Sequence, residues 1–232
     1  MDYAIIAAGE GSRLVQEGVK RPKPLIRLNG VPLLGRLASL FLQNGATTVN
    51  VIVNEEMKEV QEYLGQLRLP VPLRILVKST PGSMHSFFEL KEYLTNERFC
   101  LTTVDAICQK EEFKRYIQSF LESEDIDGLM AVTGYIDDEK PLYVNTDGDM
   151  LVKSFSDKAE ADSRYVSGGI YCLKRTTLNV LEHAMTKGMS RMRDYQRLLI
   201  EEGLTLKAYP FGKIIDIDHA GDIAKAEQFL NA

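Results

Sequence analysis

The sequence predicts an α/β fold, a single domain built on a doubly wound, mixed but mostly parallel sheet. Three observations predict it. Strand-like and helix-like segments alternate, the first apolar segment ends in glycines, and no repeat or Pro/Ser-rich linker divides the chain. Alternating strands and helices are typical of βαβ units, whose neighbouring strands run parallel. The 232 residues, 44% hydrophobic and 26% charged, are enough for a substantial core.

The alternation is regular up to about residue 134. Residues 3–8 are apolar without interruption, as in a strand buried on both faces. Shorter apolar runs bounded by turn residues predict further strands, and amphipathic stretches between them predict helices. The expected strands are 3–8, 49–53, 73–77, 99–104 and 128–133, and the expected helices are 32–43, 55–67, 84–94 and 111–122.

After residue 134 the rhythm changes. Residues 135–156 contain short extended pieces separated by the turn-like stretches "DDEKP" and "NTDGD". The later segments resume a pattern of strands and helices. The expected strands are 166–173, 204–209 and 213–217, and the expected helices are 176–186, 191–202 and 220–230.

Composition narrows the class of partner. The formal net charge of −5 gives no reason to expect nucleic acid or a membrane surface as a partner. Three cysteines without a CxxC pair, together with the absence of a long apolar stretch or a secretory leader, predict a cytoplasmic protein with reduced thiols. An anionic ligand therefore requires a local basic site, and cations do cluster early in the chain, at Arg13, Lys20, Arg21, Lys23 and Arg27.

Gly9 and Gly11 follow the first strand at its carboxyl end, where open α/β sheets bind ligands. Glycines there let backbone N–H groups approach phosphate oxygens. A dinucleotide fingerprint would need a further glycine at Leu14, and the Gly-Lys-Ser/Thr of a P-loop is absent. A GxG pair by itself is equally compatible with a simple tight turn.

The stretch "AAGEGSRL" followed by "RPKPL" resembles the signature of the sugar-1-phosphate nucleotidyltransferases, roughly AAGxGxR(L/M) plus (R/K)PK(P/A). The resemblance implies a Rossmann-like fold and transfer of a nucleotidyl group from an NTP to a sugar 1-phosphate, which gives an NDP-sugar and pyrophosphate with the help of Mg²⁺. Such products supply cell-surface polysaccharide synthesis. Residues 1–134 are then expected to form a nucleotide-binding half and residues 135–232 a sugar-phosphate-facing half.

The resemblance also implies roles for single residues. Arg13 and the proline-flanked Lys23 are the expected catalytic cations, because phosphoryl transfer needs positioning and charge neutralisation. Ser83 could equally be a helix N-cap. The expected nucleotide-binding residues are Ala7, Ala8, Gly9, Gly11, Ser12, Gly82 and Ser83.

Carboxylates are expected to hold the Mg²⁺. In the family an aspartate after the fourth strand binds metal, and Asp105 matches it, although Val104 replaces the usual glycine. A second carboxylate comes from a motif before the last helix, where Asp216 and Asp218 are both candidates, Asp216 being preferred. Asp222 is better suited to the first turn of the closing helix.

Sugar-phosphate contacts are expected in the second half. "SFSDKAEA" resembles the family's "EKP" segment, with Asp157 and Lys158 in place and Ala159 where proline is usual, and "YVSGGIYCL" resembles "NAGIY". The expected sugar-phosphate residues are Asp157, Lys158, Ser167, Gly168 and Gly169.

Other functions remain open at this stage. They are a CTP-dependent cytidylyltransferase acting on phosphocholine or a similar phosphorylated alcohol, a non-catalytic nucleotide sensor, and a glycosyltransferase of similar fold that consumes NDP-sugar. Self-association into a homo-oligomer is possible. Because these residues stop one helix beyond Asp216, we expect no β-helical acyltransferase domain.

Overall fold

The central strand β1 (Asp2–Ala7) is buried along its whole length in the computed structural model, which describes residues 1–161 and 163–231. It pairs in parallel with β4 (Thr48–Val53) on one side and β6 (Arg98–Thr103) on the other. Beyond β4, the parallel strand β5 (Leu73–Val77) forms the edge. The carboxyl ends of these strands therefore open at one edge of the sheet, as the first half of the sequence predicts.

The second half of the chain adds to the same sheet. Strand β11 (Tyr165–Lys174) is antiparallel to β6 and to β8 (Gly128–Thr133), and β12 (Leu206–Phe211) continues in parallel beside β8. The hairpin of β9 (Tyr143–Thr146) and β10 (Val152–Ser156) joins through β11. These pairings determine the direction of each of the nine strands. Only β10 and β11 run opposite to the other strands, which confirms the mixed, mostly parallel sheet.

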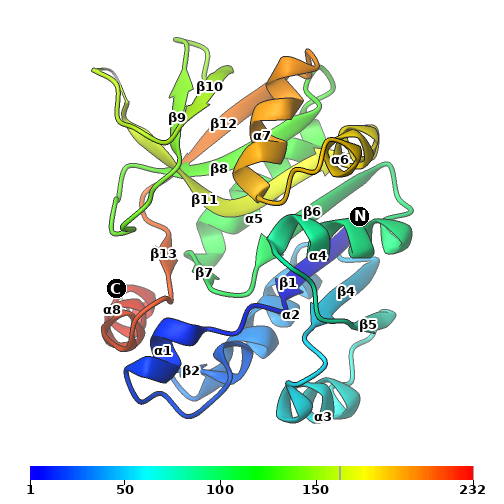
Figure 1. Ribbon diagram of the computed structural model, residues 1–232, viewed down its shortest axis with the longest axis vertical. Helices are drawn as coiled ribbons and strands as arrows, with labels where there is room; N and C mark the ends of the chain where they lie inside the picture. The colour runs from blue at the N-terminus through cyan, green and yellow to red at the C-terminus, as the bar shows by residue number, and fades with distance from the viewer. Residues whose placement is uncertain (162, 232) are drawn as a thin grey trace.

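Helices cover both faces of the sheet, so the fold has three layers (Figure 1). Successive strand residues point to opposite faces, and accordingly Ile5 and Ile6 belong to two different hydrophobic clusters. One face is covered by α2 (Leu33–Gln43), α3 (Lys58–Gln66) and α5 (Lys110–Glu122). The opposite face is covered by α4 (Ser83–Leu90), α6 (Thr177–Thr186) and α7 (Met192–Glu201).

Several predicted boundaries move, for local reasons. Helix α3 begins three residues later than expected because the Asn54 side chain accepts the N–H of Glu56 at 2.9 Å, which forms a turn instead. The expected strand 213–217 shrinks to β13 (Ile215–Asp216), which pairs outside the main sheet with β7 (Ala106–Ile107). Elements that the sequence analysis missed are α1 (Ser12–Gln16), the 3-10 turn Lys23–Leu25, the hairpin β2 (Arg27–Leu28) and β3 (Val31–Pro32), and β7. The expected helix 84–94 is divided into α4 and the 3-10 turn Lys91–Tyr93.

The closing helix α8 (Ala220–Asn231) lies beside the N-terminal segment (Figure 1). The Asn29 N–H donates to the Glu227 carboxylate at 2.8 Å, which ties α8 to the β2–β3 hairpin. This packing carries the segment before α8 toward the glycine turn after β1.

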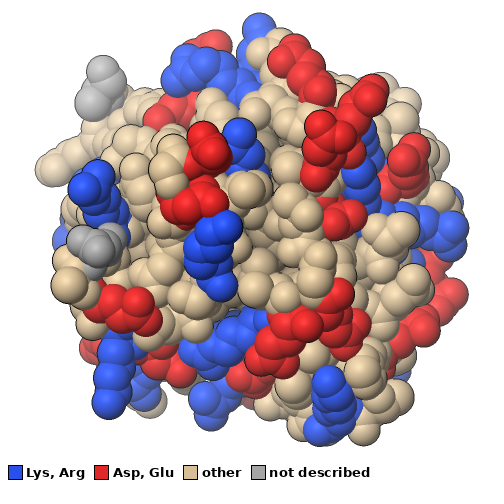
Figure 2. Space-filling model, turned by 90° about the horizontal axis from the view of Figure 1, so that it is seen from above, with Lys and Arg blue, Asp and Glu red and all other residues tan. Residues whose placement is uncertain are grey.

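Charges of both signs are interspersed over the face seen in Figure 2. Among the described residues, no helix combines the length and apolar character needed to cross a membrane.

Candidate active site

The glycine turn leads directly into the first catalytic candidates. Gly11 has a φ of 62° and forms the N-cap of α1. A Cβ atom on Gly11 would lie 3.3 Å from the Cβ of Lys23, whereas one on Gly9 would meet nothing within 4 Å. The sequence needs glycine at position 11 because the backbone is left-handed there and the Lys23 stem packs against it.

The Lys23 ammonium is held between two carboxylates. Its Nζ donates to Asp105 at 2.6 Å and to Asp218 at 2.8 Å, and the side chain is only 10% exposed. Burial by itself would lower the Lys23 pKa, but the adjacent charges and hydrogen bonds of Asp105 and Asp218 outweigh it and raise the pKa. Lys23 is therefore a fixed positive charge at the edge of the sheet.

Asp105 and Asp216 are brought together by the short β7–β13 pairing. Asp216 is paired with Ala106, and the Ile217 N–H donates to the Asp105 carbonyl at 3.3 Å. The Asp216 side chain is exposed to the cleft, but the protein atoms that form the cleft walls crowd around it and limit its hydration. This desolvation, followed by repulsion from Asp105 and Asp218, raises the Asp216 pKa well above its usual range.

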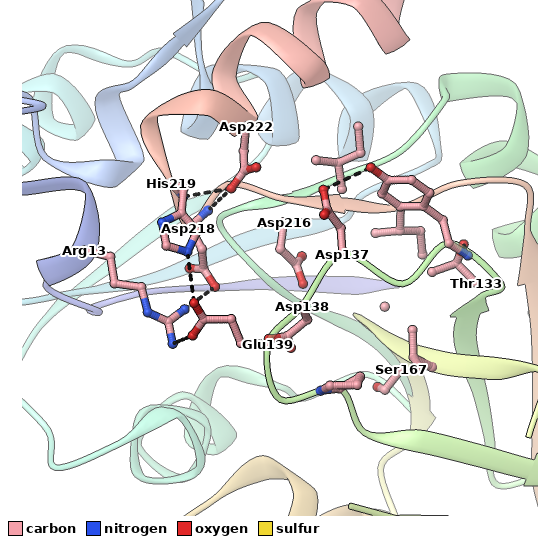
Figure 3. A pocket seen from close by; sticks show the side chains of 16 residues that line it. Arg13, Thr133, Asp137, Asp138, Glu139, Ser167, Asp216, Asp218, His219 and Asp222 are labelled. Carbon is pink, nitrogen blue, oxygen red and sulfur yellow. Dashed lines mark hydrogen bonds and ion pairs between the residues drawn. The ribbon is translucent and has the colours of Figure 1, made fainter. Parts of the chain in front are cut away.

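Asp218 is hydrogen-bonded to cations and is not part of the Asp105–Asp216 pair. Besides Lys23, it accepts from the Arg13 guanidinium at 3.1 Å. Asp222, in the first turn of α8 as expected, accepts the N–H groups of Asp218 and His219 at 3.2 and 2.8 Å and fixes the loop. In Figure 3, Arg13, Asp218 and Glu139 lie together at one end of a cavity, with Asp216 between them and Ser167.

The donor set suits Mg²⁺. Within residues 1–161 and 163–231 no group of three or more His, Cys, Asp or Glu side chains forms a ready-made metal cage. Mg²⁺, however, is usually held by one or two carboxylates together with substrate phosphates and water. The pair of Asp105 and Asp216 fits that pattern, because Asp105 is paired with Lys23 alone whereas Asp218 is paired with both Arg13 and Lys23.

A hollow of about 500 Å³ adjoins the glycine turn, and we call it the nucleotide pocket. Ala7 is buried in β1 and does not line it. Gly82 caps α4, and Ser83 is the first helical residue without a capping hydrogen bond, so the N-cap interpretation of Ser83 is wrong. The lining includes Ala8, Gly9, Gly11, Ser12, Lys23, Gly82, Ser83 and Asp105.

A second hollow of about 360 Å³, the acceptor pocket, shares Ser83, Thr103 and Asp105 with the nucleotide pocket. The two hollows therefore meet at the carboxyl end of β6. The remaining lining comes largely from the second half of the chain and includes Lys140, Ser167, Gly169, Tyr171, Arg191, Arg193, Gln196 and Asp216.

A family model described as "Nucleotidyl transferase" matches residues 3–231. This chain belongs to the nucleotidyl transferase family. The match confirms the resemblance seen in the "AAGEGSRL" and "RPKPL" motifs.

Two relatives illustrate the range of this nucleotidyl transferase family. The chain is 28% identical over 239 residues to the Bifunctional protein GlmU of Methanococcus maripaludis (strain C5), an alignment that covers 100% of the chain and 55% of the relative. The chain thus spans about half the length of the curated relatives that it matches over its full extent. It is 24% identical to the D-glycero-alpha-D-manno-heptose 1-phosphate guanylyltransferase of Campylobacter jejuni, over 77% of the chain and 78% of that protein.

Solved structures share the fold. The inositol-1-phosphate CTP transferase from T. maritima superposes with a TM-score of 0.81 at 19% identity, over 98% of this chain and 95% of that one. A structure described as a putative glucose-1-phosphate thymidylyltransferase from Bacillus anthracis gives a TM-score of 0.83 at 18% identity, over 98% and 94%. Both neighbours support the Rossmann-like architecture of this nucleotidyl transferase.

The predicted sugar-phosphate residues of the nucleotidyl transferase separate in space. Ser167 and Gly169 line the acceptor pocket. Gly168 lines the cavity of Figure 3 instead. Glycine at this position makes room for Ile214, because a Cβ atom at residue 168 would lie 2.3 Å from the Ile214 Cδ1. Asp157 and Lys158 line an adjacent hollow of about 480 Å³ outside both pockets.

Arg191 and Arg193 line the acceptor pocket of the nucleotidyl transferase but are not among the predicted site residues. Asp157 forms ion pairs with Arg193 and with Arg197, the latter at 2.7 Å, so it orients Arg193 at the border of the acceptor pocket. Arg191 directly precedes α7, and Arg193 is the second residue of that helix. The basic pair in "RMR", at the start of the predicted helix 191–202, was the available clue to a second anion-binding wall.

Proposed function

We propose that this nucleotidyl transferase moves a nucleotidyl group from an NTP to a sugar 1-phosphate in a Mg²⁺-dependent reaction. The observation that carries the proposal is the meeting of two hollows at Asp105, one beneath the glycine turn and one lined by the second half of the chain. Such a junction holds two phosphorylated substrates side by side, and that positioning is the main requirement of phosphoryl transfer.

In the reaction, an acceptor phosphate oxygen attacks the α-phosphorus of the NTP. A new O–P bond forms, the bond from the α-phosphorus to the oxygen bridging it to the β-phosphate breaks, and pyrophosphate leaves with that oxygen. Arg13 presents a planar fork suited to the departing phosphates, and Lys23 offers a point charge to the α-phosphate or the acceptor phosphate. Asp218, hydrogen-bonded to both cations, orients them for the incoming anions.

Asp105 and Asp216 are the residues proposed to hold Mg²⁺. Bound there, the ion would neutralise developing phosphate charge as a Lewis acid. The separate engagement of Asp218 with Arg13 and Lys23 favours Asp216 as the second ligand.

A pyrophosphate-release screen tests the proposal, with four NTPs against sugar 1-phosphates, inositol 1-phosphate and phosphocholine in the presence of Mg²⁺. Asp105→Asn is expected to abolish turnover with little change in folding, because an amide is a poorer ligand for this ion. Asp125→Asn, which changes an exposed carboxylate in a distant turn, serves as the matched control. Normal turnover by Asp105→Asn would refute the metal assignment.

A second candidate is cytidylyl transfer to another phosphorylated alcohol. A relative from Rubrobacter xylanophilus named "Bifunctional IPC transferase and DIPP synthase" is 26% identical over 94% of the chain and 47% of its own length. The inositol-1-phosphate CTP transferase neighbour favours a cyclic alcohol phosphate over phosphocholine. Choline cations bind over aromatic faces, and Tyr171 is the single aromatic residue among the described lining of the acceptor pocket.

A further inference from the structure

The acceptor pocket is lined by three cations as well as by three acids. Lys140, Arg191 and Arg193 line it, and none of them lines the nucleotide pocket. The cations expected to meet the reacting phosphates, Arg13 and Lys23, do not line the acceptor pocket. A second set of cations is therefore available for another part of the acceptor.

Among the residues that the structure describes, two of these three cations have no carboxylate partner. Arg193 is paired with Asp157 and also donates to the Lys140 carbonyl at 3.0 Å. Across residues 1–161 and 163–231, no carboxylate oxygen lies within 4.0 Å of the Arg191 guanidinium or the Lys140 ammonium. Both cations can therefore bind a ligand anion without first breaking an ion pair.

The backbone contributes to the same wall. Helix α7 begins at Met192, directly after Arg191, and has no side-chain cap. Met192 and Arg193 both line the pocket, so the positive end of the helix dipole lies at this wall. Of the three lining acids, Asp105 and Asp216 are the proposed metal ligands, and the Asp138 carboxylate accepts the backbone N–H of Lys140 at 2.9 Å.

We propose that the acceptor carries a second anionic group, remote from its reacting phosphate, and that Arg191 and Lys140 bind it. The inference rests on the proposed function, because it treats this hollow as the acceptor site. The second group is a phosphate or a carboxylate, both of which match a guanidinium fork. An acceptor with only neutral hydroxyl groups at that end leaves these cations unused.

Calorimetric binding to the whole chain tests this without requiring turnover. The probes are α-D-glucose 1-phosphate, α-D-glucose 1,6-bisphosphate and α-D-glucuronic acid 1-phosphate, and the last two distinguish phosphate from carboxylate. At least one of the two probes that carry a second anionic group is expected to bind about 10-fold or more tightly than glucose 1-phosphate, as one charge-assisted contact permits. Arg191→Gln is expected to remove most of this preference, and Arg191→Lys to restore part of it.

Arg175→Gln is the matched control, since Arg175 is exposed and lines neither pocket. Equal binding of all three probes to the wild-type chain would overturn the inference. So would an equal weakening of all three in Arg191→Gln, because Arg191 would then serve the reacting phosphate. Pyrophosphate release is followed in parallel. A preference lost in Arg191→Gln in a chain without turnover supports the anion site while refuting the proposed function.

Discussion

Replacing Lys23 by Met is expected to have opposite effects on catalysis and on metal binding. The ammonium lies 2.6 Å from Asp105 and 2.8 Å from Asp218, and these carboxylates are 17% and 38% exposed. Removing one partner of a fully buried pair costs about 3–5 kcal/mol. Because solvent reaches both carboxylates and Arg13 still neutralises Asp218, we expect the free energy of unfolding to fall by about 1–3 kcal/mol.

In Lys23→Met, turnover should fall while the affinity for a divalent metal ion should rise. Loss of one preorganised cation from a phosphoryl-transfer site is expected to reduce kcat about 10²–10³-fold, by analogy with removal of one oxyanion donor. Of the two carboxylates paired with Lys23, the proposed metal ligand Asp105 would be released to a divalent ion. A unit charge about 4 Å away contributes about 4 kcal/mol at an effective dielectric constant of about 20, so Mn²⁺ should bind at least about 10-fold more tightly without nucleotide.

Urea unfolding, pyrophosphate release and titration with Mn²⁺ followed by electron paramagnetic resonance measure the three effects. Lys20→Met, which removes an exposed neighbouring cation, is the control and should leave all three values nearly unchanged. Unaltered Mn²⁺ affinity in Lys23→Met would refute the idea that the ammonium competes for the metal carboxylates. Unaltered turnover would refute its catalytic role.

Two further predictions concern packing and protonation. Gly168→Ala is expected to lower the free energy of unfolding by about 1–3 kcal/mol because its Cβ meets Ile214, and adding Ile214→Val, which removes that Cδ1 atom, should recover part of the loss in urea unfolding. If the double variant loses as much free energy of unfolding as the two single variants together, the clash is not the cause. The raised pKa of Asp216 means that a proton competes with metal, so Mn²⁺ affinity should increase with pH through that pKa. Asp216→Asn should flatten the pH dependence, and a wild-type affinity independent of pH would contradict the assignment.

Local patterns in the sequence were sufficient for much of the fold. The apolar stretches of β1 and β8 predict strands that are buried on both faces, and both strands are buried along their length. The structure has β8 at the predicted bounds. The glycines after β1 reveal the ligand-binding edge because a left-handed turn at Gly11 needs glycine. These features depend on neighbours a few residues apart, so periodicity and turn chemistry reveal them.

The arrangement of the site depended on contacts between distant segments. Insertion of β11 between β6 and β8, and the β7–β13 pairing that joins Asp105 to Asp216, have no local pattern that specifies the partner. The same applies to Arg191, which reaches the acceptor pocket only because α7 packs on the sheet. By itself the sequence determined the α/β class, the glycine turn and the family to which its motifs belong. Only the tertiary structure decided which carboxylates converge, because strand pairing is selected by the global burial of apolar faces, a property of the whole chain.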